Sequence, residues 1–221
     1  MTEHKTISLA DQVFERLETD ILSGKYSPSD ILTELKLVGD LGVSRTPIRE
    51  ALRRLEQEHI IEISQRGILV IGVSRKDLDD ILAIRMRVEG LAAYEAAKYI
   101  TDEQLEELRE TVELQEFYVP KHDADRINGM DSKFHRLIYR FSGSKALYDT
   151  LIPLHKKVLK YRKASVENEV RSEYSSQEHR LIFEAIAAHD PELAEKRMTM
   201  HIANAREFIQ KKEFIKKKGN Q

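Results

Sequence analysis

The amino-acid sequence predicts a mostly α-helical protein of two domains: a winged helix-turn-helix in residues 1–74 and an all-helical bundle in residues 75–221. Three observations support this fold class. Apolar residues recur at helical spacing along most of the chain. One stretch, residues 60–73, is instead rich in β-branched residues. After Ser74 this β signal disappears, which favours a second domain built from helices alone.

The first domain is expected to begin with two helices. Residues 9–23 place apolar side chains at helical spacing and are followed by Gly24, which is typical of a helix end. Thr33 can cap a second helix that runs to about Leu41. These two helices precede the most informative part of the chain.

Residues 37–54, LVGDLGVSRTPIREALRR, resemble the two helices of a helix-turn-helix. Gly42 is expected at the tight turn between them, with a positive φ. Thr46 is expected to cap the next helix and Pro47 to occupy its first position, with the helix ending near Glu58.

Arginines mark one face of this third helix and apolar residues mark the other. Arg45, Arg49 and Arg53 recur every four residues. The opposite face contains Ile48, Ala51, Leu52 and Leu55. Such a helix suits a DNA major groove, since arginine can bind phosphates or donate two parallel hydrogen bonds to guanine. The alternative is a solvated arginine face, but the preceding glycine turn and cap favour DNA binding.

Residues 60–73 are expected to form a two-stranded hairpin, the wing, with Gln65, Arg66 and Gly67 at its turn. Arg66 at the tip is placed to reach a phosphate or the minor groove. An ordinary surface arginine is the alternative.

The second domain is expected to contain six helices. Their predicted ranges are 75–99, 101–119, 124–142, 145–164, 168–188 and 190–217. The breaks between them fall at Thr101, Pro120, Gly143, Ser165 and Asp190-Pro191.

Composition limits the class of protein. The absence of cysteine excludes disulfides and thiolate metal sites and fits a reducing cytoplasm. The N-terminal residues contain no apolar segment of the kind a signal peptide needs, and the longest apolar stretch, residues 67–73, is too short to span a bilayer. We therefore expect a soluble cytoplasmic protein without membrane contact. Residues 1–74 contain more acidic than basic residues, so DNA binding must depend on the local placement of arginines.

Four candidate metal ligands are expected on inward helix faces of the second domain: Asp131, His135, His179 and His201. Buried ionisable groups are costly unless they are paired or bind a metal. One carboxylate and three imidazoles suit zinc, manganese, nickel or iron(II), and do not suit calcium. Taken singly, each histidine is more often an ordinary core or surface residue, so spacing alone leaves the site undecided.

Two further residues are candidates for effector binding. Arg85 lies on an apolar stripe, where an inward guanidinium can bind an anion, and an ion pair with Glu89 is the alternative. Asn204 follows His201 by about one turn and can donate to a ligand oxygen, although polar helix residues seldom need such a role.

The segments GVSRTPIREALRRLE and SQRGILV are similar to the recognition helix and wing of the GntR superfamily of bacterial transcription regulators. IRMRVEGLAA, DSKFH, EHRLIFEAI and MTMHI resemble the FCD effector domain of FadR-type members, in their shorter six-helix branch. The resemblance covers about residues 9–210. It departs from the family at Ser144, where asparagine is frequent, and at Leu35, where some relatives have a DNA-contacting arginine.

This resemblance implies that Asp131, His135, His179 and His201 are the ligands of a divalent metal. It also implies a homodimer that binds a palindromic operator in double-stranded DNA. A small carboxylate metabolite on or beside the metal would change the affinity for DNA, and a fatty acyl-CoA ligand is not expected.

The sequence thus predicts a metabolite-responsive transcription regulator, more specifically a repressor, and not an enzyme. Arg45 and Arg49 are expected to read bases or bind phosphates. Supporting contacts are expected from Ser44, Thr46, Arg53, Arg54, Arg66 and Gly67. The alternatives are a regulator that senses the metal itself, a metal-dependent enzyme, for which no separate general base is found, and a structural bundle with histidines in its core.

Overall fold

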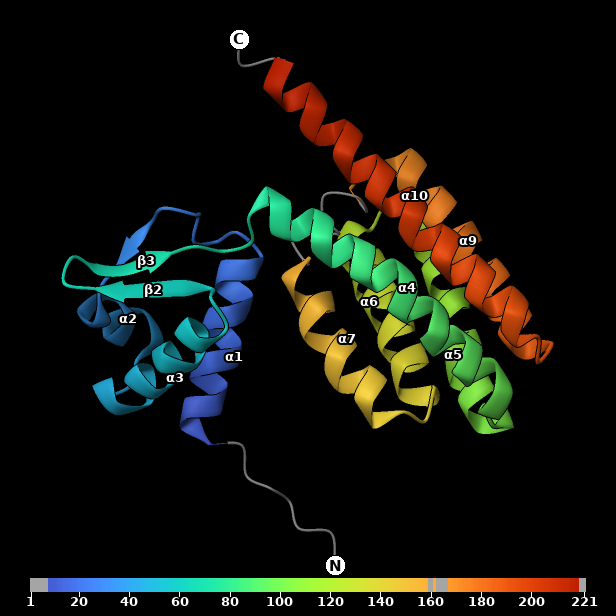
Figure 1. The fold of residues 1–221 in the computed structure, drawn as a ribbon, viewed down its shortest axis with the longest axis horizontal. Helices are drawn as coiled ribbons and strands as arrows, with labels where there is room; N and C mark the ends of the chain where they lie inside the picture. The colour runs from blue at the N-terminus through green and yellow to red at the C-terminus, as the bar shows by residue number, and fades with distance from the viewer. Residues whose placement is uncertain (1–7, 159–160, 162–166, 219–221) are drawn as a thin grey trace, which may run out of the picture. The chain divides into compact units, whose positions relative to one another are not determined.

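The computed structural model describes residues 8–158, 161 and 167–218 (Figure 1). The chain divides into two compact units, one ending at Asp77 and the other beginning at Leu78. Each unit is described separately.

The N-terminal unit contains three helices and a small antiparallel sheet. Its elements are α1 (Leu9–Leu22), β1 (Ile31–Leu32), α2 (Glu34–Leu41), α3 (Arg45–Gln57), β2 (Ile61–Ser64) and β3 (Gly67–Val70). The strand order is β1-β3-β2, with Ile31 opposite Leu69 and Ile61 opposite Val70. β2 and β3 form the predicted wing hairpin. Strand β1 was not predicted, because two residues are too few to show an alternating pattern.

The turn between α2 and α3 confirms one expectation and corrects another. Gly42 ends α2 with a φ of 68°, as predicted. The cap of α3 is Ser44, not Thr46, and the helix begins at Arg45. Pro47 is therefore the third helical residue. It is tolerated there because the first N–H groups of a helix have no partner within the helix.

The core of this unit lies between α1, α3 and the sheet. Its most buried side chains include Leu17, Leu37, Ile48, Leu55 and Ile61. Three of the four residues predicted for the apolar face of α3 have no exposed surface, and the fourth, Leu52, is also buried. Packing this face inward leaves the opposite face of α3 open to solvent.

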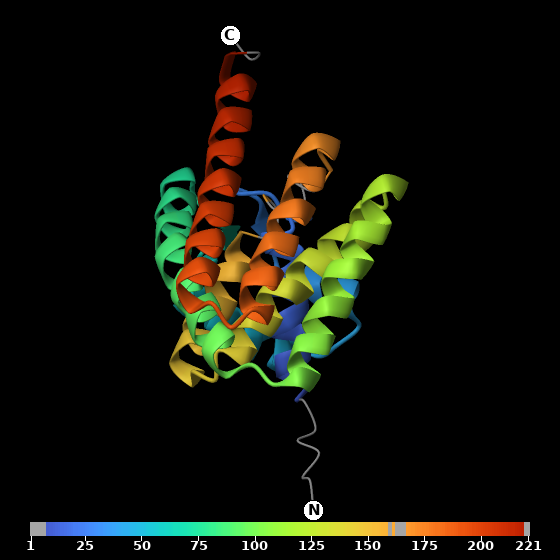
Figure 2. The same cartoon turned by 90° about the vertical axis from the view of Figure 1, so that its right-hand side faces the viewer.

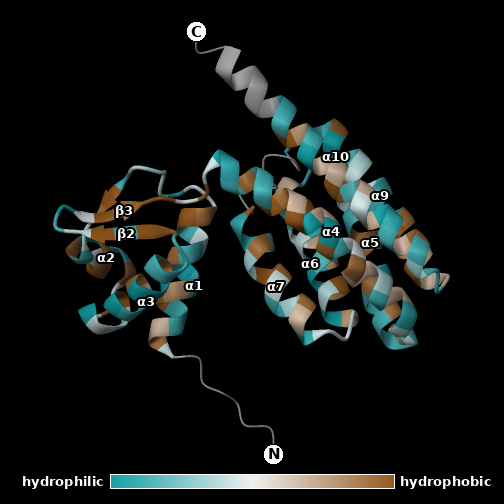
Figure 3. Cartoon of the chain, in the orientation of Figure 1, coloured by the Kyte–Doolittle hydropathy of each residue, from teal (hydrophilic) through white to brown (hydrophobic). Residues whose placement is uncertain are grey.

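In the second unit all regular structure within the described residues is helical. The elements are α4 (Arg75–Tyr99), α5 (Asp102–Tyr118), the short 3-10 helix η1 (Val119–Lys121), α6 (Ala124–Phe141), α7 (Lys145–Lys157), α9 (Glu169–Ala187) and α10 (Pro191–Lys218). Hydrophobic and hydrophilic residues alternate along these helices (Figure 3). Helix α7 ends seven residues before the predicted end at residue 164, and the predicted break at Ser165 lies outside the described residues.

Helices α5, α6, α9 and α10 form the part of the bundle that contains the candidate site. The α9 and α10 helices lie side by side (Figures 1 and 2), and α5 packs on both α6 and α9. Gly90 lets α4 approach α10, because a Cβ atom there would lie 2.5 Å from Thr199 Oγ1. The inward faces include Phe134, Ile138, Ile182 and Met198, all without exposed surface. Among the described residues no helix is long and apolar enough to cross a membrane.

Candidate metal centre and DNA-binding surface

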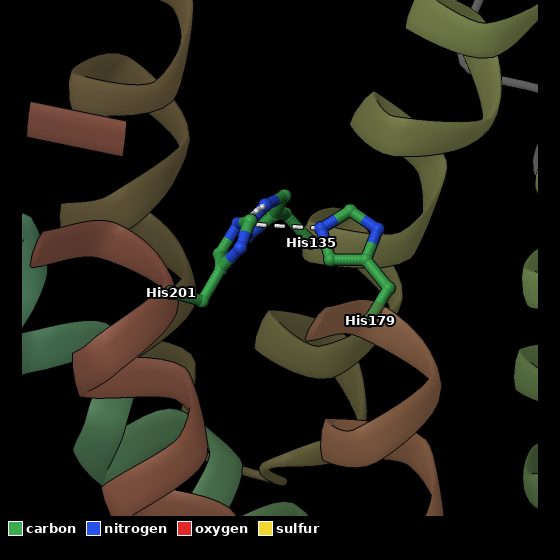
Figure 4. Close-up of side chains that lie close together, drawn as sticks. All are labelled: His135, His179 and His201. Atoms are coloured by element: carbon green, nitrogen blue, oxygen red, sulfur yellow. Dashed lines mark hydrogen bonds between the residues drawn. The ribbon is translucent and has the colours of Figure 1, made fainter. Parts of the chain in front are cut away.

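Three imidazoles from three helices meet inside the second unit (Figure 4): His135 on α6, His179 on α9 and His201 on α10. The Nε2 atom of His201 lies 3.2 Å from Nε2 of His179 and 3.3 Å from Nε2 of His135. All three side chains are at most 3% exposed. The structure therefore brings together three of the four residues expected to bind a metal, with one nitrogen of each ring directed at a common point.

The fourth expected ligand, Asp131, lies at the edge of this cluster. It precedes His135 by one helical turn on α6, and its Oδ1 atom lies 3.6 Å from Nε2 of His179. The side chain is buried. A carboxylate at this position is close enough to serve as a fourth donor.

Apolar packing fixes where these side chains point. Phe134 precedes His135 on α6, has no exposed surface, and stacks on the His179 ring with 4.2 Å between ring centroids. His201 follows the buried Met198 by three residues on α10. Because the apolar neighbours face the core, the imidazoles face it too.

The second nitrogen of each ring has its own hydrogen-bond partner on a side chain. The pairs are His135 Nδ1 with Glu89 Oε2, His179 Nδ1 with Gln115 Oε1 and His201 Nδ1 with Glu178 Oε2, each at 2.7 Å. Carboxylate and amide oxygens accept hydrogen bonds, so each Nδ1 is the protonated donor. In a neutral ring this leaves a lone pair on Nε2.

Electrostatics keep His201 neutral. Burial lowers the pKa of His201 to about 4, although the Glu178 carboxylate favours the charged form. Burial alone would raise the pKa of Glu178, but hydrogen bonding to His201 and the charge of Arg171 lower it to about 2. At neutral pH an ionised Glu178 therefore faces an uncharged imidazole.

A metal ion fits this arrangement of donors. Three lone pairs directed at one another at these separations repel unless a cation or a proton lies between them. Nitrogens bound about 2.0–2.1 Å from a zinc ion in tetrahedral geometry lie about 3.3 Å apart, which is close to the observed separations. Hydrogen bonds from the second ring nitrogen to carboxylate or carbonyl oxygens are also the usual support of metal-binding histidines.

A cavity of about 40 Å³ adjoins the cluster. Its polar lining comes from Arg85, Asp131, His135, Arg171, Ser172, Ser175 and His201. Arg171 is 7% exposed and donates from Nη2 to Glu178 at 2.9 Å. Its Nε atom is buried and has no hydrogen-bond partner among the described residues. This cavity combines the imidazole cluster with a donor that lacks an acceptor.

The two residues expected to bind an effector differ in their placement. Arg85 lines the cavity, but its Nε atom donates to Glu89 at 2.5 Å, which is the ion pair considered as the alternative. Burial alone would raise the pKa of Glu89, yet the charge of Arg85 and the hydrogen bond from His135 hold it well below its ordinary value. Asn204 is exposed, does not line the cavity, and donates to Glu178 at 2.8 Å. Asn204 thus supports Glu178 and is not among the residues that line this cavity.

The first unit presents the expected arginine face. Ser44, Arg45, Thr46, Arg49, Arg53 and Arg66 are all exposed. Arg45, Arg53 and Arg66 form no ion pair with any residue that the structure describes. Arg49 is held by Glu34 at the start of α2, with Nε donating to Oε1 and Nη2 to Oε2, both at 2.9 Å.

Arg54 contacts two residues of the first helix. Its Nη1 atom donates to Asp11 Oδ1 at 2.6 Å, and its guanidinium lies 3.9 Å from the centre of the Phe14 ring. Both partners belong to α1, so Arg54 joins α3 to α1. The supporting DNA contact expected of Arg54 stays a prediction.

Gly67 has a structural reason to be glycine. Its φ is 122°, and a Cβ atom there would lie 2.9 Å from both Ile31 Cγ2 and the Leu32 carbonyl oxygen. Strand β1 approaches the wing too closely for a side chain.

Sequence reasoning missed the partners that orient the histidines: Glu89, Gln115 and Glu178. It considered Glu89 only as a partner for Arg85, and it did not consider Arg171. A polar residue on an otherwise apolar helix face is the signal that could have found Gln115, which lies one turn after Thr111 and is 1% exposed.

Comparisons with known proteins agree with this architecture. The pattern of the family described as "Bacterial regulatory proteins, gntR family" matches residues 9–70, and the pattern of the FCD domain matches residues 80–204. The HTH-type transcriptional regulator YdhC of Bacillus subtilis (strain 168) is 30% identical over 192 residues, covering 86% of each chain. The HTH-type transcriptional repressor RspR of Escherichia coli (strain K12) is 28% identical, covering 90% of this chain and 87% of the relative.

Among solved structures, E. coli McbR/YncC superposes with a TM-score of 0.82 at 25% identity. The superposition covers 94% of this chain and all of that chain.

Proposed function

We propose that a small carboxylate metabolite controls the affinity of this protein for DNA. The chain belongs to the GntR family of bacterial regulatory proteins and contains an FCD domain. It is therefore a DNA-binding transcription regulator and not an enzyme. In this proposal the metabolite binds at or beside a divalent metal in the second unit. We further propose a cytoplasmic homodimer that represses transcription from a palindromic operator.

The observation that supports a metal most strongly is the convergence of three Nε2 atoms whose rings are each fixed through Nδ1. His135, His179 and His201 would hold the ion, with Asp131 as the fourth ligand. The donor set suits zinc, manganese, nickel or iron(II). When bound, the ion would supply a Lewis-acid anchor for an effector carboxylate.

The cavity beside the cluster supports the choice of a carboxylate. Arg171 lines the cavity and has a buried Nε donor without a partner among the described residues, and Ser175 adds a hydroxyl group to the lining. A guanidinium donor and a carboxylate form a charge-assisted hydrogen bond. Arg85 also lines the cavity, but the charge of Glu89 already neutralises it. We therefore assign effector binding to Arg171 ahead of Arg85, and we assign no ligand contact to Asn204.

On the first unit we assign DNA contacts to the exposed face of α3 and to the wing tip. Arg45 and Arg49 would contact bases or phosphates, and Arg53 and Arg66 would contact phosphates. Ser44 and Thr46 lie at the N-terminal end of α3, where backbone N–H groups also favour an anion. An effector changes DNA affinity only to the extent that it binds one arrangement of the dimer more tightly than another.

Thermal unfolding of chelator-treated protein tests the proposal. Divalent metals are added first, then a panel of small carboxylates with and without metal, since a ligand of the native state raises the midpoint. We expect metal to raise the midpoint and one acid to raise it further only when metal is present. The same acid should then change the affinity for an operator duplex.

A matched pair of variants locates the effect. His201→Ala should abolish stabilisation by metal and by acid. His122→Ala should retain both, because the His122 side chain is 62% exposed and lies outside the cluster. If metal alone changed DNA affinity and no acid added to it, the metal itself would be the signal. If neither metal nor acid shifted the midpoint, the proposed site would be wrong.

A further inference from the structure

Glu34 and Arg49 form an ion pair between the two helices of the helix-turn-helix. Glu34 is the first residue of α2, and Arg49 lies on the exposed face of α3. Arg49 Nε donates to Oε1 at 2.9 Å and to Oε2 at 3.0 Å, and Arg49 Nη2 donates to Oε2 at 2.9 Å. The carboxylate therefore binds the side edge of the guanidinium with both oxygens.

The adjoining end edge of the same guanidinium, formed by Nη1 and Nη2, has no hydrogen-bond partner among the described residues. Arginine has five N–H donors in one plane, and Glu34 takes the Nε donor and one Nη2 donor. No other hydrogen bond to Arg49 is formed by the residues that the structure describes. On this end edge the remaining Nη2 donor and one Nη1 donor are parallel, which is the geometry that fits O6 and N7 of guanine.

We propose that Glu34 is a positioning residue that fixes the guanidinium of Arg49 and presents its free edge to a guanine in the operator. This inference rests on the proposed DNA contact of Arg49. It adds that the base preference of Arg49 depends on a carboxylate that touches no base.

Two properties of the Glu34–Arg49 pair indicate that Glu34 positions Arg49 and does not serve only to stabilise the fold. The side chains of Arg49 and Glu34 are 57% and 34% exposed, and exposed ion pairs add little to stability. The hydrogen bond from Arg49 lowers the pKa of Glu34, so the carboxylate stays ionised at neutral pH. An ionised carboxylate beside the guanidinium also repels DNA phosphates, which favours a base contact of Arg49 over a phosphate contact.

The test needs a DNA probe and a charge control. A duplex is enriched from a random-sequence library with the wild-type protein, and affinities are measured for this duplex and for random duplex. The variants are Glu34→Ala, Glu34→Gln, Arg49→Ala, the double variant Glu34→Ala with Arg49→Ala, and Glu50→Ala. Glu50 is exposed on α3 and, among the described residues, has no ion-pair partner, so its replacement removes an equal charge without removing a contact of Arg49.

A good bidentate contact discriminates by about 1–3 kcal/mol, which is about 5- to 150-fold in the ratio of the two affinities. Arg49→Ala should lower the preference for the enriched duplex within this range. Glu34→Ala should lower it by at least about fivefold, while its affinity for random duplex stays equal or rises, because Arg49 is released to bind phosphates. Glu34→Gln keeps one acceptor, so its preference for the enriched duplex should lie between those of the wild type and Glu34→Ala. Glu50→Ala should keep the wild-type preference.

The double variant shows whether Glu34 acts through Arg49. We expect it to match Arg49→Ala, with no further loss of preference. If Glu34→Ala or Glu34→Gln folded with an unchanged midpoint and kept the preference that Arg49→Ala loses, Glu34 would not be a positioning residue. If Arg49→Ala itself kept the preference, the proposed base contact of Arg49 would fail, and this inference would fail with it.

Discussion

Gln115 provides a sharp test of the metal centre, because it touches a candidate ligand without being one. Its Oε1 atom accepts a hydrogen bond from His179 Nδ1 at 2.7 Å, and its side chain is 1% exposed. Its Nε2 atom is buried and has no partner among the described residues. Gln115→Leu removes both the useful acceptor and the unsatisfied donor.

In the metal-free protein, losing the Oε1 acceptor and losing the unsatisfied Nε2 donor change the free energy of unfolding in opposite directions. An unsatisfied buried polar group costs about 1–3 kcal/mol, so removing Nε2 stabilises the fold by about as much as losing the acceptor for His179 destabilises it. We therefore expect the midpoint of the metal-free variant to stay close to that of the wild type. For metal affinity, no gain from removing Nε2 offsets the loss of the acceptor that orients His179. Loss of a partner that orients a metal-binding histidine lowers metal affinity about 10- to 100-fold, which is about 1.4–2.7 kcal/mol.

Thermal unfolding at a fixed free zinc concentration measures the difference. One kcal/mol shifts the midpoint of a domain of this size by about 2–4 °C, so stabilisation by zinc should shrink by roughly 3–10 °C. Gln115→Glu is the matched variant. It keeps the acceptor, adds a negative charge near the ion, and should retain or increase zinc affinity. Equal zinc affinity in Gln115→Leu and wild type would refute the role of Gln115, and with it the argument that fixed imidazoles define the site.

Three other predictions concern stability. Arg54→Ala should lower the free energy of unfolding by about 1 kcal/mol, because it removes the guanidinium over Phe14. The base preference in DNA binding should stay unchanged. A changed preference would indicate that Arg54 also contacts DNA. Gly67→Ala should lower the free energy of unfolding by about 1–3 kcal/mol, because alanine is strained at this positive φ and its β-carbon would contact Ile31. An unchanged denaturation midpoint would contradict the close approach of β1. His155 lies on α7 and is buried, and burial holds its pKa well below its ordinary value of 6.5. Just below pH 6.5 the unfolded chain therefore binds a proton at His155 that the folded chain does not. The midpoint of metal-free protein should therefore fall as pH drops below about 6.5, and a midpoint that stayed constant from about pH 7.5 to 5.5 would refute this assignment.

The candidate metal centre shows which features helical periodicity can predict and which it cannot. Apolar neighbours such as Phe134 and Met198 show which side of a helix is buried, and this is enough to place His135 and His201 inward. Periodicity along one helix contains no information about which residues of other helices lie opposite. Glu89 lies 46 residues from His135 in the chain, and this pairing appears only when the packing of α4 on α6 is known.

The DNA-binding unit shows the same limit at the scale of single side chains. The arginine face of α3 follows from spacing, and Gly42 follows from the need for a positive φ. Arg54 lies one position after Arg53, yet it turns to Phe14 and Asp11, which lie about forty residues earlier in the chain. The start of α3 was misplaced by two residues, because Ser44 and Thr46 are both good caps and proline is accepted throughout the first turn.

The two candidate sites share one electrostatic design. At the metal centre, an oxygen acceptor holds the Nδ1 side of each imidazole and leaves Nε2 directed at the ligand space. At the DNA surface, Glu34 holds one edge of the Arg49 guanidinium and leaves the other edge free. In both cases the binding group is already oriented before its ligand arrives, which reduces the ordering that binding requires. Because Glu34 belongs to the same unit as Arg49, an effector bound in the second unit need not alter base recognition. In the proposed dimer, the proposed effector would regulate by changing how the two DNA-binding units are spaced. The affinity for the operator would then change while its sequence preference would not.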